Sequence, residues 1–327
     1  MTQPLRIGLL RLADSAPVII ARNHGFFEKH SVKTEIIVSP SWANIADGLA
    51  WKTLDSALIF PPLAIMTTLG RRGHNAHFKP LMTISRGGNT IIFRGDNPMQ
   101  GLWSPDVAGR AAFDVWCWTL GRKPRLAVVH MYSTHLLILR RFLEMIGVDI
   151  DTEIELLVMP PANMINALTQ KAIDGGCVGP SWGTEACLQG LTFLVGGSSS
   201  VLPGHVEKLF VMSDAIPKDL TNGLRNALHE AVAFCRNPDN SVDIARELAL
   251  PVDENGLELP ERATLATLTQ GATSETMTFT TQPVTVRDCA WIEADMTHLH
   301  WIDAAETARI DWWQDRQKDL AIPSPSE

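Results

Sequence analysis

The stretch that decides the fold runs from Leu126 to Trp182 and alternates apolar strands with helices. Its pieces are the strand Leu126-Ala-Val-Val-His-Met131, the polar turn Ser133-Thr134-His135, a helical pattern that stops at Gly147, a strand over residues 155–159, the turn Pro160-Pro161, a helix through Lys171, and a strand that leads to Trp182. Both helices begin just past the C-terminal end of a strand. In an open parallel sheet, this geometry points backbone N–H groups at the crevice where ligands bind. The stretch therefore predicts a site for a small, anionic ligand.

The first third of the chain repeats this plan. Apolar segments at residues 5–10, 33–38 and 54–60 are predicted strands, and each is followed by residues typical of a helix start. One of these, Asp14, is predicted to cap a helix over residues 18–29. The alternation predicts an α/β fold with parallel-rich sheets and helices on both faces.

The remaining pattern predicts a second lobe inserted into the first. Glycines interrupt a strand over residues 81–93, and a strand at 206–212 is the expected return crossing. Residues 1–90 plus 205–327 are expected to form lobe 1 and residues 91–204 lobe 2, with the ligand cleft between them. Residues 96–125 lack a clear period, residues 251–283 are predicted to be mostly irregular, and the chain from 291 onward is predicted to be helical.

Composition limits the function and the location. The chain has 327 residues and a net charge of −8 without a basic cluster, which argues against direct nucleic-acid binding. It has no apolar run of about 18 residues, so no membrane insertion is expected. Its N-terminus leads directly into a strand instead of a signal peptide, and its five cysteines form no Cys-x-x-Cys pair. These features predict a cytoplasmic protein with reduced cysteines.

Motifs for catalysis and for cofactors are missing. The sequence contains no Gly-x-Ser-x-Gly elbow, phosphate loop, dinucleotide fingerprint or His-Glu-x-x-His motif. His298 and His300 are two residues apart, a spacing that does not place both on one face of a helix. The sequence therefore predicts a binding protein with no catalytic residues, no metal site and no cofactor.

The chain resembles the nitrate- and bicarbonate-binding proteins of ABC transporters, a branch of the type II periplasmic-binding-protein fold. The resemblance covers residues 5–240 through short pieces in a shared order. These are Leu5-Arg-Ile-Gly, Asp14-x-Ala16-Pro17, Ala21-Arg-Asn-His-Gly-Phe-Phe27, Pro40-Ser-Trp-Ala43, Leu54-Asp-Ser-Ala57, Gly88-Asn-Thr-Ile91, Ser133-Thr-His135 with Leu139-Arg140, Val158-Met-Pro-Pro161, and Ile173-Asp-Gly-Gly-Cys-Val-Gly179 with Trp182.

The resemblance implies binding of a small anion. In exported members it implies delivery of the anion to a permease. Similar unexported proteins are nitrate/nitrite sensors that sequester an RNA-binding antiterminator of nitrate-assimilation transcripts and release it when nitrate binds. Since no signal peptide is predicted, the sequence is expected to encode such a sensor, with the antiterminator as its protein partner.

Six residues are predicted to bind the anion. The resemblance places the ammonium of Lys208 in the cleft, where a lysine favours nitrate or nitrite over bicarbonate. A desolvated anion also needs N–H or O–H donors, and the remaining candidates are Trp42, Asn89, Thr134, His135 and Pro161. Each has a structural alternative: core packing for Trp42, turn formation for Asn89 and Pro161, and a role at the helix start for Thr134 and His135, with capping favoured for Thr134.

Two departures from the family pattern bear on the alternatives. Pro180-Ser181-Trp182 stands where the family carries Glu-Pro-Trp, and Ile45-Ala46-Asp47 keeps only the acid of an Arg-Asp pair. Without that glutamate the cleft is expected to lack a clear carboxylate, which argues against an enzyme of this fold that makes thiamine or menaquinone precursors. The other alternative is the substrate-binding component of an ABC anion transporter.

Overall fold

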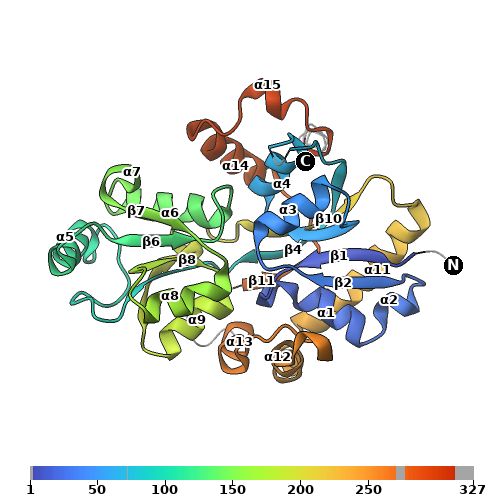
Figure 1. The fold of residues 1–327 in the computed structure, drawn as a ribbon, viewed down its shortest axis with the longest axis horizontal. Helices are drawn as coiled ribbons and strands as arrows, with labels where there is room; N and C mark the ends of the chain where they lie inside the picture. Colours follow the sequence, from blue (N-terminus) through green and yellow to red (C-terminus); the bar gives the residue numbers. More distant parts are fainter. Residues whose placement is uncertain (1–2, 72, 270–276, 314–327) are drawn as a thin grey trace, which may run out of the picture.

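Two β-sheets, each covered by helices, make up the structure (Figure 1). The computed structural model describes residues 3–71, 73–269 and 277–313. The first sheet has the strand order β11 (Met277–Phe279), β4 (Phe78–Gly87), β10 (Val206–Ser213), β3 (Ser56–Ile59), β1 (Leu5–Leu9), β2 (Thr34–Val38). The second sheet has the order β7 (Glu155–Val158), β6 (Arg125–Val128), β8 (Gly175–Val178), β5 (Thr90–Arg94), β9 (Thr192–Gly197). The predicted α/β class is confirmed.

Strand direction is more mixed than predicted. Parallel pairing joins β1 to β2 and β3 in the first sheet, and β6 to β7 and β8 in the second. The strands next to the crossings, β4 and β10 on one side and β5 on the other, pair antiparallel. A strand that enters from the other sheet runs antiparallel to its neighbours. The alternation of helices and strands in the sequence does not predict that direction.

Helices cover both faces of each sheet (Figure 1). The helices that pack on the first sheet are α3 (Trp42–Ala50) and α4 (Pro61–Thr68) on one face, and α11 (Lys218–Arg236) with α1 (Ala16–Asn23) on the other. The second sheet lies between α6 (Thr134–Met145) and the pair α8 (Met164–Thr169) and α9 (Pro180–Leu188). The helix predicted over residues 18–29 is divided into α1 and α2 (Phe26–Lys29) because Gly25 takes a left-handed φ of 70°.

The chain passes between the sheets at Gly88 and Asn89, and again between β9 and β10 through the short helix α10 (Ser198–Val201). Gly88 has a φ of +89°, and a Cβ there would lie 2.7 Å from the Cβ of Met277. Glycine is therefore required at the first crossing by both the backbone and the neighbouring strand β11. We propose that residues 1–90 plus 205–327 and residues 91–204 act as the two lobes.

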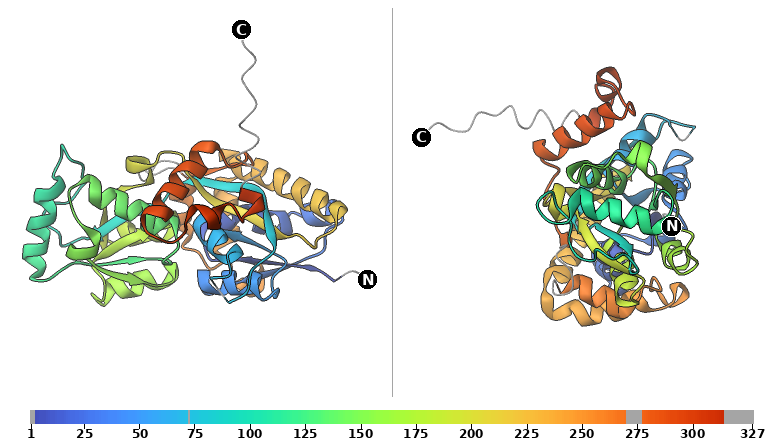
Figure 2. Two further views of the ribbon diagram at one scale, coloured as in Figure 1. Left: turned by 90° about the horizontal axis from the view of Figure 1, so that it is seen from above. Right: turned by 90° about the vertical axis from the view of Figure 1, so that its left-hand side faces the viewer.

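The C-terminal part is more ordered than predicted. Within residues 251–283, where irregular structure was expected, lie helix α13 (Glu261–Leu268) and strand β11, after α12 (Ser241–Ala249). Helix α13 packs against α9 of the second sheet, and α14 (Val286–His298) packs against α4 of the first. Figure 2 shows α14 and α15 (Ala304–Thr307) lying over the junction between the two halves. The end of the predicted C-terminal helix, residues 314–327, lies outside the described residues.

Helix α5 (Gly109–Leu120) was missed by the sequence pattern. Its buried side chains include Phe113 and Trp116, but Val115 and Trp118 are apolar and exposed, the latter by 84%. Apolar residues on both faces hide the helical period. Within the described ranges, no helix combines the length and the apolar character that crossing a membrane requires.

Candidate functional site

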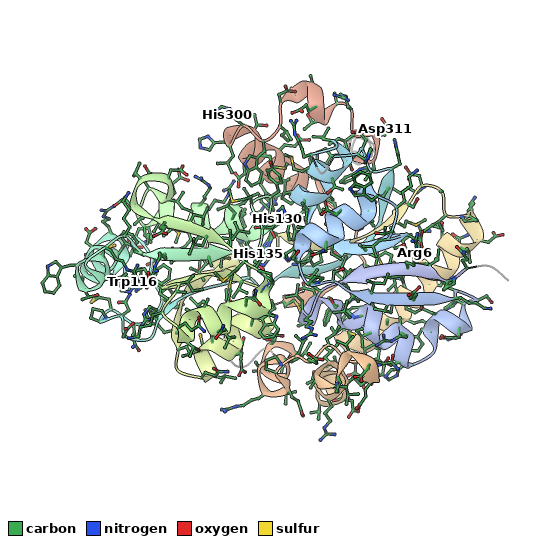
Figure 3. All side chains as sticks on the ribbon, in the orientation of Figure 1. Arg6, Trp116, His130, His135, His300 and Asp311 are labelled. Carbon is green, nitrogen blue, oxygen red and sulfur yellow. The ribbon has the colours of Figure 1, made fainter. Side chains whose placement is uncertain are left out.

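A cluster of buried polar side chains lies where the two sheets meet. Most of its members follow the carboxyl ends of strands, as the sequence predicts for a ligand site, while Glu207 and Lys208 lie at the amino end of the antiparallel strand β10. They come from the 3-10 turn after β1 (Asp14), the first residue of α3 (Trp42), the crossing after β4 (Asn89), the start of α6 (Thr134 and His135) and the start of β10 (Glu207 and Lys208). In Figure 3, His135 is labelled between the two halves of the molecule.

Five of the six predicted binding residues belong to this cluster. Each is at most 1% exposed: Trp42, Asn89, Thr134, His135 and Lys208. The sixth, Pro161, begins a short 3-10 helix and lines a separate cavity of about 300 Å³ together with Arg11, Pro40 and Pro160. The structure thus brings side chains from both sheets together, although their assignment to a ligand stays a prediction.

The ammonium group of Lys208 is already surrounded by protein groups. It donates to Glu207 Oε1 at 2.5 Å and lies 3.9 Å from Asp14 Oδ2. The same nitrogen lies 5.3 Å from the centre of the Trp42 ring and 5.7 Å from that of Phe60, within cation–π distance of both. Lys208 therefore supplies a positive charge whose nearest counter-charge is internal.

Glu207 is the central acceptor of the cluster, and the sequence analysis missed it. Its Oε2 accepts from Asn89 Nδ2 at 2.7 Å and contacts His205 Nε2 at 2.9 Å, while Oε1 lies 3.7 Å from His135 Nδ1. The expectation that the cleft lacks a carboxylate is therefore wrong. The available signal was the position of Glu207 beside Lys208 in the predicted return strand, where a β-bulge lets both neighbours remain buried.

Asp14 is a second buried carboxylate, and its predicted role as a helix cap is also wrong. The residues at the N-cap positions of this turn and of α1 are Leu12 and Ser15, and neither accepts a capping bond through its side chain. The Asp14 side chain instead accepts a hydrogen bond from the hydroxyl of Ser85 on β4. Tertiary contact with a distant strand has replaced the local interaction that the sequence favoured.

Three potential donors in the cluster have no hydrogen-bond partner among the described residues: Trp42 Nε1, Thr134 Oγ1 and His135 Nδ1. The cap of α6 is Ser133, whose hydroxyl oxygen accepts from Leu136 N at 3.1 Å, so the capping role favoured for Thr134 is wrong. A buried polar atom without a partner costs about 1–3 kcal/mol. The buried cluster that contains Lys208 thus holds three unsatisfied donors.

Burial and neighbouring charges give the titratable side chains of the cluster different protonation states. Burial lowers the pKa of His135 to about 3, so its imidazole is neutral at pH 7. Burial alone would raise the pKa of Glu207, but the Lys208 ammonium and the two histidines hold it well below its usual value. Burial raises the pKa of Asp14. The cluster thus contains one carboxylate that stays ionised, Glu207, beside the ammonium group of Lys208.

Other candidate sites are weaker. A second cavity of about 410 Å³ lies between α6, α7 (Ile150–Glu153) and α14, where Arg140 pairs with Asp151 and Arg141 with Asp295. In the part of the chain that the structure describes, no group of three His, Cys, Asp or Glu side chains is placed to hold a metal ion.

Comparison with known proteins points to the same branch of folds. The sequence model of the NMT1-like family matches residues 1–249. The nitrate import ATP-binding protein NrtC of Synechocystis is 31% identical over 253 residues, which are 76% of this chain and 37% of that protein. The nitrate/nitrite binding protein NrtA of Synechococcus elongatus is 27% identical over 246 residues, 72% of this chain and 55% of that protein. The chain therefore spans only part of the length of these relatives.

Solved structures agree with the fold. The crystal structure of the periplasmic nitrate-binding protein NrtA from Synechocystis superposes with a TM-score of 0.81 at 21% identity, covering 98% of this chain and 89% of that one. The alkanesulfonate-binding protein SsuA from Xanthomonas axonopodis, bound to MOPS, gives a TM-score of 0.67 at 16% identity, covering 92% and 94%. The predicted periplasmic-binding-protein architecture is confirmed.

Proposed function

The chain belongs to the NMT1-like family, and from that premise we propose that it closes on nitrate or nitrite and works as a sensor. It is homologous to nitrate- and bicarbonate-binding proteins and has the substrate-binding fold found in ABC transporters. One observation supports a small oxyanion above all: the unpartnered donors of Trp42, Thr134 and His135 lie in the buried cluster that holds the ammonium of Lys208.

The size of the guest sets the expected affinity. Nitrate has four heavy atoms, and a ceiling of about 1.5 kcal/mol per atom gives about −6 kcal/mol, or a Kd of about tens of micromolar. A flat, weakly hydrated anion also suits the apolar wall that the rings of Trp42 and Phe60 form, since their centres lie 4.5 Å apart.

Binding alone, without turnover, is the proposed activity. Both oxygens of Glu207 are already engaged, by Lys208 on one side and by Asn89 and His205 on the other. A general base needs a free lone pair within reach of its substrate. This arrangement supports a fixed electrostatic role for Glu207 instead of proton abstraction.

Calorimetry with nitrate, nitrite, bicarbonate and sulfate tests the ligand. We expect heat from nitrate or nitrite, and its loss in the variant His135→Ala/Lys208→Met/Glu207→Gln, which removes the imidazole and both members of the buried ion pair together. Trp118→Phe, far from the cluster, is the matched control. If an organic metabolite binds while none of the four anions does, the proposed ligand is wrong.

The sensor role requires a partner that distinguishes the ligand-free and ligand-bound states, because a partner with equal affinity for both transmits nothing. We propose an RNA-binding antiterminator as this partner and the cytoplasm as the location. The five cysteines of the sequence form no Cys-x-x-Cys pair, which supports a reducing compartment.

Co-purification of the tagged protein with and without nitrate tests the partner. Release of an RNA-binding protein on nitrate addition is expected for the sensor. Nitrate-dependent association with a membrane permease, together with recovery of the protein outside the cytoplasm, would instead identify the substrate-binding component of an ABC transporter.

A further inference from the structure

Only one of the two oxygens of the Asp14 carboxyl group has a hydrogen-bond partner among the described residues. Its Oδ1 accepts the hydrogen bond from Ser85, whereas Oδ2 is buried and has no hydrogen-bond partner within the described chain. Oδ2 lies 3.9 Å from the Lys208 ammonium. Asp14 as a whole is 1% exposed, so its second oxygen is shielded from bulk solvent.

The charges around Asp14 decide which form of this carboxyl is compatible with a bound anion. From β10 it faces Lys208 and Glu207, and beyond them lie His135 on α6 and His205 before β10, both in contact with Glu207. Lys208 donates to Glu207 at 2.5 Å, so the positive charge is already balanced. An ionised Asp14 and nitrate would then be two uncompensated anions in a dry compartment, which is strongly unfavourable.

We infer that Asp14 completes the site as a neutral carboxylic acid whose Oδ2–H donates a hydrogen bond to the bound oxyanion; this inference rests on the proposed function. Ser85 supports the arrangement because its hydroxyl occupies Oδ1 and leaves Oδ2 as the oxygen that carries the proton. The donor set then consists of an indole N–H, a hydroxyl, an imidazole N–H and a carboxyl O–H, from Trp42, Thr134, His135 and Asp14.

The protonation of Asp14 is consistent with its surroundings. Burial raises its pKa, and the negative Glu207 raises it further, while Lys208 and the Ser85 hydrogen bond oppose the shift. A carboxyl group held neutral by an apolar, enclosed site is an established way to supply a hydrogen-bond donor at neutral pH. Asp14 is therefore a residue that sets specificity for an acceptor-only guest.

Nitrate is the right probe because it is the anion of a strong acid and keeps one charge throughout the useful pH range. Calorimetric titrations from about pH 5.5 to 9 should show wild-type affinity falling by up to about tenfold per pH unit once Asp14 ionises in the free protein. Asp14→Asn carries a neutral donor at all pH values. We expect it to bind nitrate within about threefold of wild type at the acidic end and to lose this pH dependence.

Two further variants complete the design. Asp14→Ala removes the donor and should lose at least about tenfold in nitrate affinity. Ser85→Ala removes a hydrogen bond that favours the ionised form, so it should move the fall in affinity to higher pH. If Asp14→Ala fails to fold, as judged by its thermal unfolding, Asp14→Asn and Ser85→Ala still decide the question.

The outcomes separate this inference from the proposed function. Nitrate binding with a flat wild-type pH profile overturns the inference alone, as does a pH dependence that persists in Asp14→Asn, since the proton would then belong to another group. Much tighter binding by Asp14→Asn at every pH would mean that Asp14 is ionised in the complex, which also overturns it. No binding of nitrate or nitrite at any pH overturns both proposals.

Discussion

Lys208 Nζ and Glu207 Oε1 lie 2.5 Å apart between sequence neighbours that are both 1% exposed. Adjacent residues of a regular strand point to opposite faces, so only the irregular register at the start of β10 lets the two side chains meet. The pair supplies the cluster with a cation without giving it net charge. We therefore expect its energetics to affect stability and, under the proposed function, the capture of an anion.

Removing one member of this pair should be costly. Lys208→Met leaves Glu207 buried and unpaired, so we expect a loss of about 3–5 kcal/mol in the free energy of unfolding. The double variant Lys208→Met/Glu207→Gln should recover much of it. Chemical denaturation measures both, and Lys29→Met, which removes an exposed pair with Glu230, should cost at most about 1 kcal/mol. Equal losses at Lys208 and Lys29 would contradict the buried-pair interpretation.

Acid should destabilise the protein through His135. The folded pKa of this group is about 3, below its ordinary value of 6.5, so the unfolded state takes up the proton first. Stability is then lost as the pH falls from about 6.5 toward 3, by up to about 1.4 kcal/mol per pH unit. Comparison of unfolding curves for wild type and His135→Gln isolates this contribution. His229→Gln, at an exposed position on α11, is the matched control for a histidine substitution.

A substitution at Trp42 distinguishes hydrogen-bond donation by the indole N–H from packing by the ring. Trp42→Phe keeps an aromatic wall but removes Nε1, a donor with no protein partner among the described residues. Because hydrogen bonds to charged groups contribute about 1.5–3 kcal/mol, nitrate affinity should fall by about tenfold to a hundredfold. Calorimetry on Trp42→Phe and on the exposed-surface control Trp118→Phe measures this difference. Unchanged affinity in Trp42→Phe would mean that the indole serves only to pack the core.

The ion pair between Arg141 and Asp295 joins α6 of the second sheet to α14, which packs on the first. If it helps to hold the two halves together, Arg141→Gln should weaken nitrate binding by about twofold to fivefold, the effect of a partly exposed pair. Arg140→Gln is the matched control because Arg140 pairs with Asp151 beside the second sheet only. Nitrate titrations and small-angle scattering of both variants provide the test. A larger effect from Arg140→Gln would exclude a bridging role for Arg141.

The sequence predicted the elements around the site better than their tertiary partners. The strand-then-helix order placed Trp42 and His135 at helix starts because capping residues and apolar periods are local signals. It failed at Asp14 and Thr134, where a local capping role was favoured. In the structure, Ser85 from a distant strand binds Asp14, and Ser133 caps α6 in place of Thr134.

The sequence by itself determined the α/β class, the glycine at the crossing and the family, since periodicity, turn chemistry and ordered motifs are written along the chain. Only the tertiary structure decided the charge balance of the cluster. Glu207, Lys208 and Asp14 interact through space at a junction of two sheets, and burial there sets which of them are ionised. Desolvation and the distance between charges depend on the folded arrangement, and neither is encoded in residue order alone.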